Sequence, residues 1–130
     1  MKEKARVRRP TDAELGILRV LWQRGPSTVR EVQAILNRGR ATGYTTVLKL
    51  LQIMTEKGLV VRDERARAHL YEARQPEEET QRRLVGDLLD RAFGGSAEKL
   101  VLQALSGRAA SPEELSRIRK LLDELEGGEP

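Results

Sequence analysis

The sequence predicts a mainly helical protein with one small β-hairpin. Apolar residues recur with helical spacing along most of the chain, capping residues and glycines separate these stretches, and one pair of short alternating segments lies near the middle. The chain has 130 residues, of which 34% are charged and 38% hydrophobic. This length and composition fit one ordinary globular domain or two very small ones.

The first helix is expected to begin at Thr11. Glu14 follows three residues later, and a Thr–Glu pair at this spacing forms a capping box, in which each side chain accepts a hydrogen bond from the other residue's backbone N–H. Apolar residues then recur at helical spacing as far as Trp22, and Gly25-Pro26 ends the helix. Residues 1–10 are basic and lack apolar periodicity, and they are predicted to form a flexible arm.

Two further helices follow in the front half of the chain. Ser27 is the expected N-cap of a short second helix. That helix ends at residues 37–39, where Gly39 is expected to be free to adopt a positive φ. A third helix is predicted from about residue 43 to residue 57, with Gly58 as the residue that ends it.

A β-hairpin is predicted directly after the third helix. Residues 59–62 have the composition of a strand, residues 68–72 alternate as its partner, and residues 63–67 form a polar, basic tip between them. Three helices followed by a hairpin, over residues 12–73, are the element order of a winged helix-turn-helix, whose hairpin is called the wing. Residues 11–74 are therefore expected to form one such domain.

Beyond residue 75 the pattern changes to three more helices. The first begins after Pro76 with three glutamates and runs to about Phe93, and residues 94–96 break it. A short helix follows, and residues 111–114 form another capping box at the start of the last helix. Helices this small gain stability by docking, so residues 75–130 are expected to form an α-helical dimerisation domain. The residues expected at the dimer interface are Leu84, Leu88, Leu100, Val101, Leu115, Ile118, Leu121, Leu122 and Leu125.

The net charge of +4 conceals an asymmetry between the two parts of the chain. Residues 1–75 carry 16 Lys and Arg against 8 Asp and Glu, whereas residues 76–130 carry 8 against 12. A basic front part indicates a polyanionic partner. In helix-turn-helix proteins a recognition helix enters the major groove of double-stranded DNA, so its exposed residues should be polar with a few cations. The candidate DNA-contacting residues are Ser27, Thr28, Arg30, Thr42, Gly43, Tyr44, Thr45, Thr46, Leu48, Lys49, Gln52, Arg65 and Arg67.

Structural interpretations of the same residues stay open beside the functional ones. Ser27 is first of all an N-cap, and Leu48 suits either a contact with a thymine methyl or a packed position under the wing. Arg65 and Arg67 suit either a phosphate contact or a solvated turn. For the whole domain, the alternative function is a winged-helix interaction module that holds an acidic protein partner.

The composition excludes several classes of function. The chain has no cysteine and one histidine, so it lacks disulfides, thiolate metal sites, cysteine nucleophiles and histidine-rich metal sites. No glycine-rich phosphate loop occurs, and we expect neither enzymatic activity nor a cofactor. The apolar runs are only a few residues long and no signal peptide is evident, which predicts a cytoplasmic protein without membrane insertion.

An ordered series of motifs extends from about residue 10 to residue 125. The motifs are Pro10-Thr11-Asp12-Ala13-Glu14-Leu15 with Leu18 and Leu21-Trp22, Thr28-Val29-Arg30-Glu31-Val32, Gly43-Tyr44-Thr45-Thr46-Val47-Leu48-Lys49-Leu50-Leu51, Glu56-Lys57-Gly58-Leu59-Val60, Arg67-Ala68-His69-Leu70-Tyr71 and Phe93-Gly94-Gly95-Ser96. The series resembles the penicillinase repressor family, also called BlaI/MecI. The resemblance implies a homodimeric repressor whose N-terminal winged helix binds inverted-repeat operators and whose C-terminal helices form the dimer interface. The positions that match the family's base-reading residues are Thr45, Thr46, Leu48 and Lys49.

The resemblance also implies a way in which repression is relieved. Several family members are inactivated by cleavage of the C-terminal domain, triggered by a membrane sensor protease that detects β-lactam antibiotics. The cleaved bond there joins Asn to Phe, and the matching positions here are Gln103 and Ala104, a departure from the family pattern. A copper-responsive branch carries a C-terminal cysteine cluster, which this chain lacks.

Overall fold

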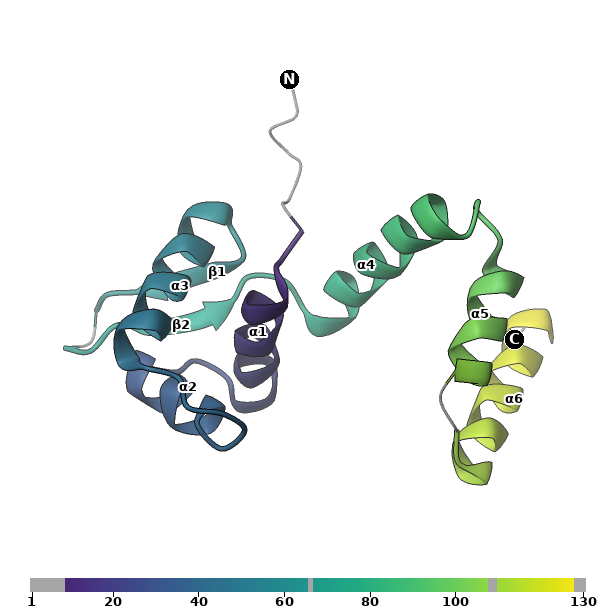
Figure 1. Ribbon diagram of the computed structural model, residues 1–130, viewed down its shortest axis with the longest axis horizontal. Coiled ribbons are helices and arrows are strands. Elements are labelled where there is room, and N and C mark those ends of the chain that lie inside the picture. The colour runs from purple at the N-terminus through teal and green to yellow at the C-terminus, as the bar shows by residue number, and fades with distance from the viewer. Residues whose placement is uncertain (1–8, 66, 108–109, 128–130) are drawn as a thin grey trace, which may run out of the picture. The chain divides into compact units, whose positions relative to one another are not determined.

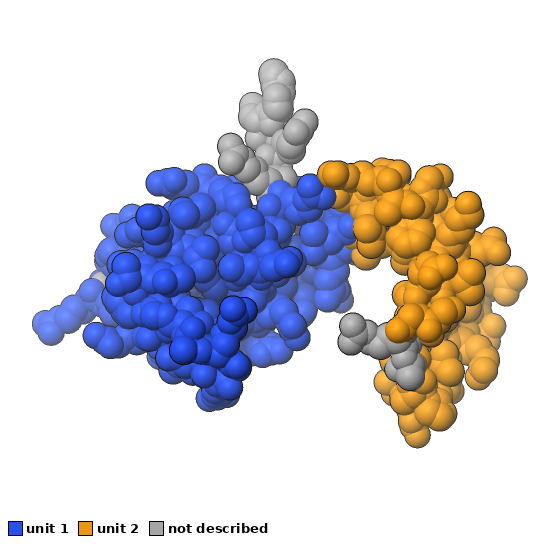
Figure 2. Space-filling model, in the orientation of Figure 1, with its two compact units in different colours: residues 1–84 blue, residues 85–130 orange. Residues whose placement is uncertain are grey.

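The computed structural model describes residues 9–65, 67–107 and 110–127. The predicted flexible arm lies almost entirely outside the described residues. The chain divides into two compact units, residues 1–84 and residues 85–130, which Figure 2 shows in separate colours. The domain boundary expected near residue 75, with DNA binding before it and dimerisation after it, stays a prediction.

Helix α1, Asp12–Arg24, begins and ends as the sequence predicts. The backbone N–H of Thr11 donates to Glu14 Oε1 (2.9 Å), and the N–H of Glu14 donates to Thr11 Oγ1 (3.2 Å), which completes the capping box. At the other end Gly25 has a φ of 89°, a conformation that residues with a Cβ rarely adopt.

Helix α2, Val29–Leu36, corrects two predictions. Its N-cap is Thr28 and not Ser27, because Thr28 has Glu31 three residues later and forms a second capping box, whereas Ser27 is followed at that spacing by an arginine. Ser27 is instead buried and pairs with Tyr71: the Ser27 N–H donates to the Tyr71 carbonyl (2.9 Å), and the Tyr71 N–H donates to the Ser27 carbonyl (2.8 Å). Gly39 does not adopt a positive φ. Its N–H donates to the Leu36 carbonyl, three residues earlier, so the chain continues α2 with a 3₁₀-type turn.

Helix α3, Tyr44–Lys57, and the hairpin follow as predicted, with small shifts in the strand ends. Gly58 ends α3 in the left-handed conformation, with a φ of 82°. Strands β1, Val60–Asp63, and β2, Leu70–Ala73, are antiparallel and pair Val60 with Ala73. The hairpin lies against α1 and α3, so the first unit has the predicted winged-helix arrangement (Figure 1).

One hydrophobic core joins the three helices to the inner face of the hairpin. Its buried members are Ile17, Leu18, Val20, Leu21, Val29, Val32, Val47, Leu51, Met54, Leu59, Val60 and Tyr71. One ion pair closes the edge of this core: Lys57 Nζ donates to both carboxylate oxygens of Glu14, at 2.8 and 3.0 Å, and Glu14 is only 2% exposed. This pair connects the start of α1 to the end of α3 and so fixes the orientation of α3.

The remaining helices are α4, Glu77–Ala92, α5, Ala97–Gly107, and α6, Pro112–Gly127. Gly94 and Gly95, with φ values of 57° and 82°, form the predicted break after α4. None of the described residues of these three helices is buried. Their apolar side chains are therefore available to a partner.

Candidate nucleic-acid interface

The outward face of α3 is mainly polar, with the cation Lys49 in its middle and the anion Glu56 near its end. Thr45, Thr46, Lys49 and Gln52 are exposed there, while the opposite face of the helix is buried in the core. Leu48 is half-buried and packs against the core, which favours the structural interpretation of this residue. Hydroxyl, ammonium and amide groups on a helix of this kind can donate to both base edges and phosphates.

The N-terminus of α3 differs from those of α1 and α2. Gly43 is its N-cap, offers no side-chain cap, and no acidic residue lies in the first turn. By contrast, the glutamates of the two capping boxes place a carboxylate at the N-termini of α1 and α2. The positive end of the α3 dipole is therefore not neutralised by a carboxylate of its own first turn.

Arg30 of α2 stacks on the first residue of α3. The carbon between its guanidinium nitrogens lies 5.1 Å from the centre of the Tyr44 ring, within the range of a cation–π contact. The neighbouring Glu31 is engaged elsewhere: it accepts from the Thr28 N–H and pairs with Arg24 at 2.9 Å. The Thr28 hydrogen bond and the charge of Arg24 lower the pKa of Glu31. Arg30 and Tyr44 thus present a supported cation beside α3.

Ser27 lies inside the core, unlike the other predicted contact residues. It is fully buried, its hydroxyl donates to the Gly25 carbonyl (2.8 Å), and its oxygen accepts from Arg24 Nε (3.0 Å). Its side chain therefore has a structural role and does not reach the surface. Thr28 is half-buried as an N-cap, and Thr42 is half-buried in the turn before α3.

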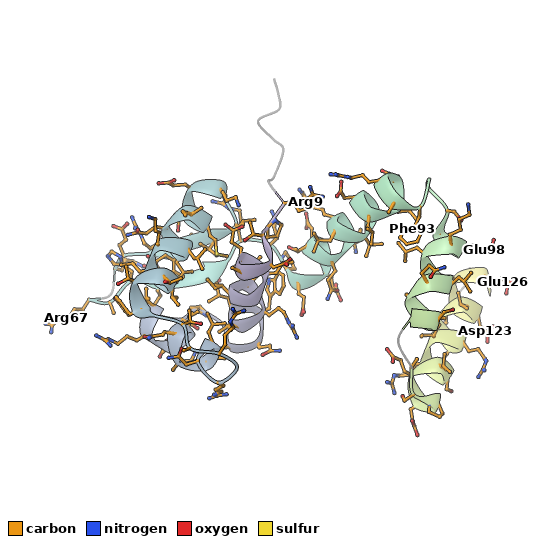
Figure 3. All side chains as sticks on the ribbon, in the orientation of Figure 1. Arg9, Arg67, Phe93, Glu98, Asp123 and Glu126 are labelled. Atoms are coloured by element: carbon orange, nitrogen blue, oxygen red, sulfur yellow. The ribbon has the colours of Figure 1, made fainter. Side chains whose placement is uncertain are left out.

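The two arginines at the tip of the wing, residues 63–67, differ in their surroundings. Arg65 donates to both carboxylate oxygens of Asp63, at 3.0 and 2.8 Å, and its backbone N–H donates to the same carboxylate. These contacts lower the pKa of Asp63 to about 2. Arg67, at the far end of the hairpin in Figure 3, is exposed and forms no salt bridge with any described residue. The tip of the wing therefore presents one neutralised arginine and one unneutralised arginine, and Arg62 of β1 is paired with Glu64.

Sequence reasoning missed two exposed arginines, Arg38 and Arg40, in the turn between α2 and α3. A signal for them was present in the sequence. Residues 32–55 contain these two arginines and Lys49, and no Asp or Glu. A stretch with this composition has no internal anion to balance its charge, and it forms the helix-turn-helix itself.

A family model described as penicillinase repressor matches residues 10–124. The chain belongs to the penicillinase repressor family. The transcriptional regulator BlaI of Mycobacterium tuberculosis is 33% identical over 125 residues, which cover 95% of this chain and 90% of the relative. The penicillinase repressor of Bacillus licheniformis is 24% identical over 114 residues, which cover 88% and 89% of the two chains.

A solved structure confirms the fold class. The solution structure of monomeric Bacillus licheniformis BlaI in complex with the blaP half-operator matches with a TM-score of 0.50 and 22% identity. The match covers 57% of this chain and 90% of that chain. The winged-helix fold predicted from the order of the elements is thus the fold of this penicillinase repressor family member.

The residues predicted to form the dimer interface differ in how exposed they are in the C-terminal helices of this family member. Leu84, Leu100, Leu115 and Ile118 are half-buried. The exposed ones are Leu88, Val101, Leu121, Leu122 and Leu125, and Leu125 is 78% exposed. Gln103 and Ala104, the counterparts of the family's cleaved bond, are exposed residues inside α5.

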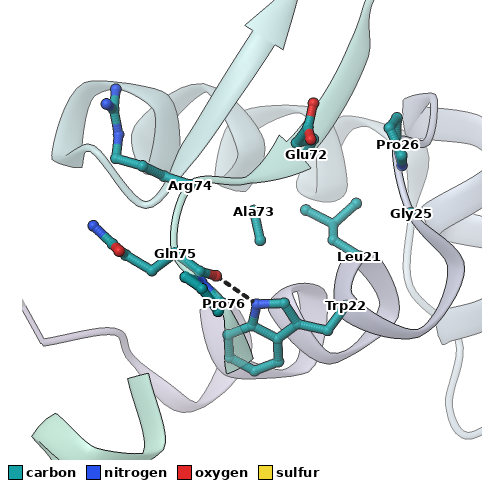
Figure 4. Close-up of a pocket in the computed structure, with 9 residues that line it drawn as sticks. All are labelled: Leu21, Trp22, Gly25, Pro26, Glu72, Ala73, Arg74, Gln75 and Pro76. Carbon is teal, nitrogen blue, oxygen red and sulfur yellow. Dashed lines mark hydrogen bonds between the residues drawn. The ribbon is translucent and has the colours of Figure 1, made fainter. Parts of the chain in front are cut away.

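A pocket of about 300 Å³ lies beside the segment that leaves the wing (Figure 4). It is lined by Leu21, Trp22, Gly25, Pro26, Glu72, Ala73, Arg74, Gln75 and Pro76. The indole N–H of Trp22 donates to the Gln75 carbonyl (2.9 Å) and fixes the path of the chain there. The lining holds no nucleophile paired with a base, and the described residues contain no group of His, Asp and Glu that could hold a metal. The same described residues include no helix long and apolar enough to cross a membrane.

Proposed function

We propose that this chain is a DNA-binding transcriptional repressor that binds an inverted-repeat operator as a homodimer. The observation that carries the proposal is the outward face of α3, which offers hydroxyl, amide and ammonium groups on a winged-helix scaffold. No Asp or Glu occurs between residues 32 and 55 to repel a phosphate backbone. Two relatives, a transcriptional regulator and a penicillinase repressor, support the same function.

In this proposal α3 enters the major groove. Lys49 and Gln52 reach base edges or phosphates from the middle of the helix, and Thr45 and Thr46 do so from its first turn. Arg30 contacts a phosphate beside the groove, held in position by the ring of Tyr44. The wing adds a further cation to the neighbouring backbone or minor groove.

The exposed apolar residues of α5 and α6 support dimerisation. Leu125 is 78% exposed on an amphipathic helix, and exposing so much apolar surface to water is unfavourable. A second copy of the chain offers a matching apolar surface that would bury it. A dimer binds two half-sites jointly, so its affinity exceeds that of one domain without any new contact. The expected operator is therefore an inverted repeat with half-site centres about one helical turn apart.

Proteolysis by a membrane sensor protease is the proposed route of relief, by the family's precedent. The counterpart bond, between Gln103 and Ala104, lies within α5, and a protease needs an extended substrate, so cleavage requires local unwinding of this helix. Both side chains are exposed in the single chain, and the proposed dimer contacts of Leu100 and Val101 would have to open before α5 unwinds. The separated helices would no longer hold the two domains together.

The test is a selection of bound sites from a random duplex library at about 0.15 M salt, where non-specific Coulomb binding is partly screened. Enrichment of an inverted repeat supports the proposal. Lys49→Ala should then weaken binding and lower the slope of log affinity against log salt by about one for each protomer. Lys120→Ala removes another exposed lysine, from α6, and is the matched control, with no expected effect.

The outcome that contradicts the proposal is equally clear. If no sequence is enriched and binding simply fades as salt rises, the basic face holds polyanions without reading them. The interaction module for an acidic protein would then be the better interpretation of the same surface.

A further inference from the structure

The turn between α2 and α3 presents two arginines on a well-fixed backbone. Asn37 Oδ1 accepts from the Thr42 N–H at 2.6 Å, and Gln33 Nε2 donates to the Thr42 carbonyl at 3.1 Å. The Thr42 hydroxyl donates to the Arg40 carbonyl at 3.2 Å, and the Arg38 N–H donates back into α2. The turn therefore holds the backbone of both arginines in place at the entrance to α3.

Neither arginine has an internal charge partner. Arg38 and Arg40 are exposed, and no salt bridge joins either of them to another described residue. The acidic residue before them in the chain, Glu31, already accepts from an N-cap N–H and pairs with Arg24. The next acidic residue after them is Glu56, at the far end of α3. Two like charges two residues apart repel each other, so the free turn is less favourable than the turn beside an anion.

We propose that Arg38 and Arg40 each bind a phosphate of the DNA backbone and anchor the helix-turn-helix by its turn. The proposal rests on the proposed function and goes beyond it, because it assigns backbone contacts to residues outside α3 and the wing. A guanidinium donates two parallel N–H bonds to a phosphate, which fixes direction as well as charge. A rigid turn anchored in this way would set the depth and angle at which α3 enters the groove.

Phosphate contacts leave a signature that base contacts do not. Each neutralised phosphate contributes about 0.9 to the salt slope, so removing both arginines should lower the slope by about 1.8 for each protomer. Between about 0.05 and 0.2 M salt, that difference corresponds to an affinity change of roughly tenfold for each half-site. The affinities for a selected duplex and for a scrambled duplex should fall by the same factor, since phosphates carry no sequence information.

The experiment measures the fluorescence anisotropy of labelled duplexes with the full chain over a range of salt concentrations. The test variant is Arg38→Ala/Arg40→Ala, and the matched control is Arg117→Ala/Arg119→Ala, which removes two exposed arginines at the same spacing from α6. Arg38→Lys/Arg40→Lys keeps the charge, so its salt slope should stay near that of the parent. Circular dichroism melting and sedimentation check that each variant is folded and has the parent's oligomeric state.

The results separate this inference from the proposed function. A lower slope for the double alanine variant, an unchanged slope for the control and an unchanged selectivity support the inference. If Lys49→Ala weakens binding but the turn variant has the parent's slope, the inference is wrong and the proposed function stands. A change of selectivity at constant slope also overturns it, because the arginines would then read bases. If neither the Lys49 nor the turn variant affects binding, the proposed function fails as well.

Discussion

Asp63→Asn should tighten DNA binding, although Asp63 lies in the wing and not in α3. In the wing, the Asp63 carboxylate holds the guanidinium of Arg65 by two bonds of 3.0 and 2.8 Å. An amide at this position keeps an oxygen for the Arg65 backbone N–H but loses the charge that binds the side chain. The variant therefore releases a cation at the tip and removes an anion from the surface that the proposed function places beside DNA.

The magnitude follows from the number of charges released. One additional arginine on a phosphate raises the salt slope by about 0.9 for each protomer, which is roughly threefold in affinity between about 0.05 and 0.2 M salt. Acidification cannot imitate the substitution. Since the contacts to Arg65 lower the pKa of Asp63 to about 2, the carboxylate stays charged above that pH and is neutralised only as the pH falls through it.

The assay is the salt dependence of anisotropy, with single variants of the two arginines at the tip of the wing, Arg65 and Arg67. In the parent, Arg67→Ala should lower the slope by about 0.9, and Arg65→Ala should lower it by much less, because Asp63 already neutralises Arg65. In the Asp63→Asn background the two arginines should become equivalent. An unchanged or lower slope for Asp63→Asn, or equal effects of the two arginines in the parent, would refute the reasoning.

Three further predictions concern the scaffold, the stack and the dimer. Glu14→Gln leaves Lys57 without its anion, and urea unfolding should show a loss of about 2–3 kcal/mol, below the full cost of a broken buried pair because Lys57 is partly exposed. Burial opposes ionisation of Glu14, but the hydrogen bonds and the charge of Lys57 lower the pKa of Glu14 overall. The stability of the parent should therefore fall as the pH falls through that lowered pKa, whereas the stability of the Glu14→Gln variant should not. Tyr44→Leu should weaken DNA binding about two- to fivefold because it removes the ring under Arg30, whereas Tyr44→Phe should leave the affinity unchanged because it retains the ring. Equal losses of affinity in the two variants would contradict the stack. Leu125→Glu should give a monomer with lower operator affinity in sedimentation and anisotropy, and a persistent tight dimer would place the interface elsewhere.

Local patterns predicted the elements of the first unit because each was decided within a few residues. The capping box of Thr11 and Glu14 and the left-handed Gly58 were readable from spacing alone. The same rule of spacing identifies Thr28 as the second N-cap, since Glu31 follows it three residues later. The prediction for Ser27 was wrong because its position is set by a strand-like pairing with Tyr71, far along the chain, which no local pattern reveals.

The candidate site divides in the same way. The polar face of α3 was predicted from helical periodicity, and its exposure follows from the burial of the opposite face. The pairing of Arg65 with Asp63, two residues apart, and the isolation of Arg38 and Arg40 were both present in the sequence as local charge patterns. Counting arginines as equivalent cations obscured them. The Arg30–Tyr44 stack joins two helices and required the fold.

Some charged residues of the first unit are paired within the scaffold, and others are exposed without a salt bridge to another described residue. Glu14 with Lys57 and Glu31 with Arg24 are paired within the fold, where they cap helices and fix the orientation of α2 and α3. These pairs cannot be offered to DNA without weakening the scaffold. A cation without an ion pair in the fold contributes no salt bridge to stability and remains available to an external anion. Arg38 and Arg40 meet this description in the turn. The salt slopes of their variants, compared with the slope of Asp63→Asn, count which arginines neutralise DNA phosphates and which are neutralised within the protein.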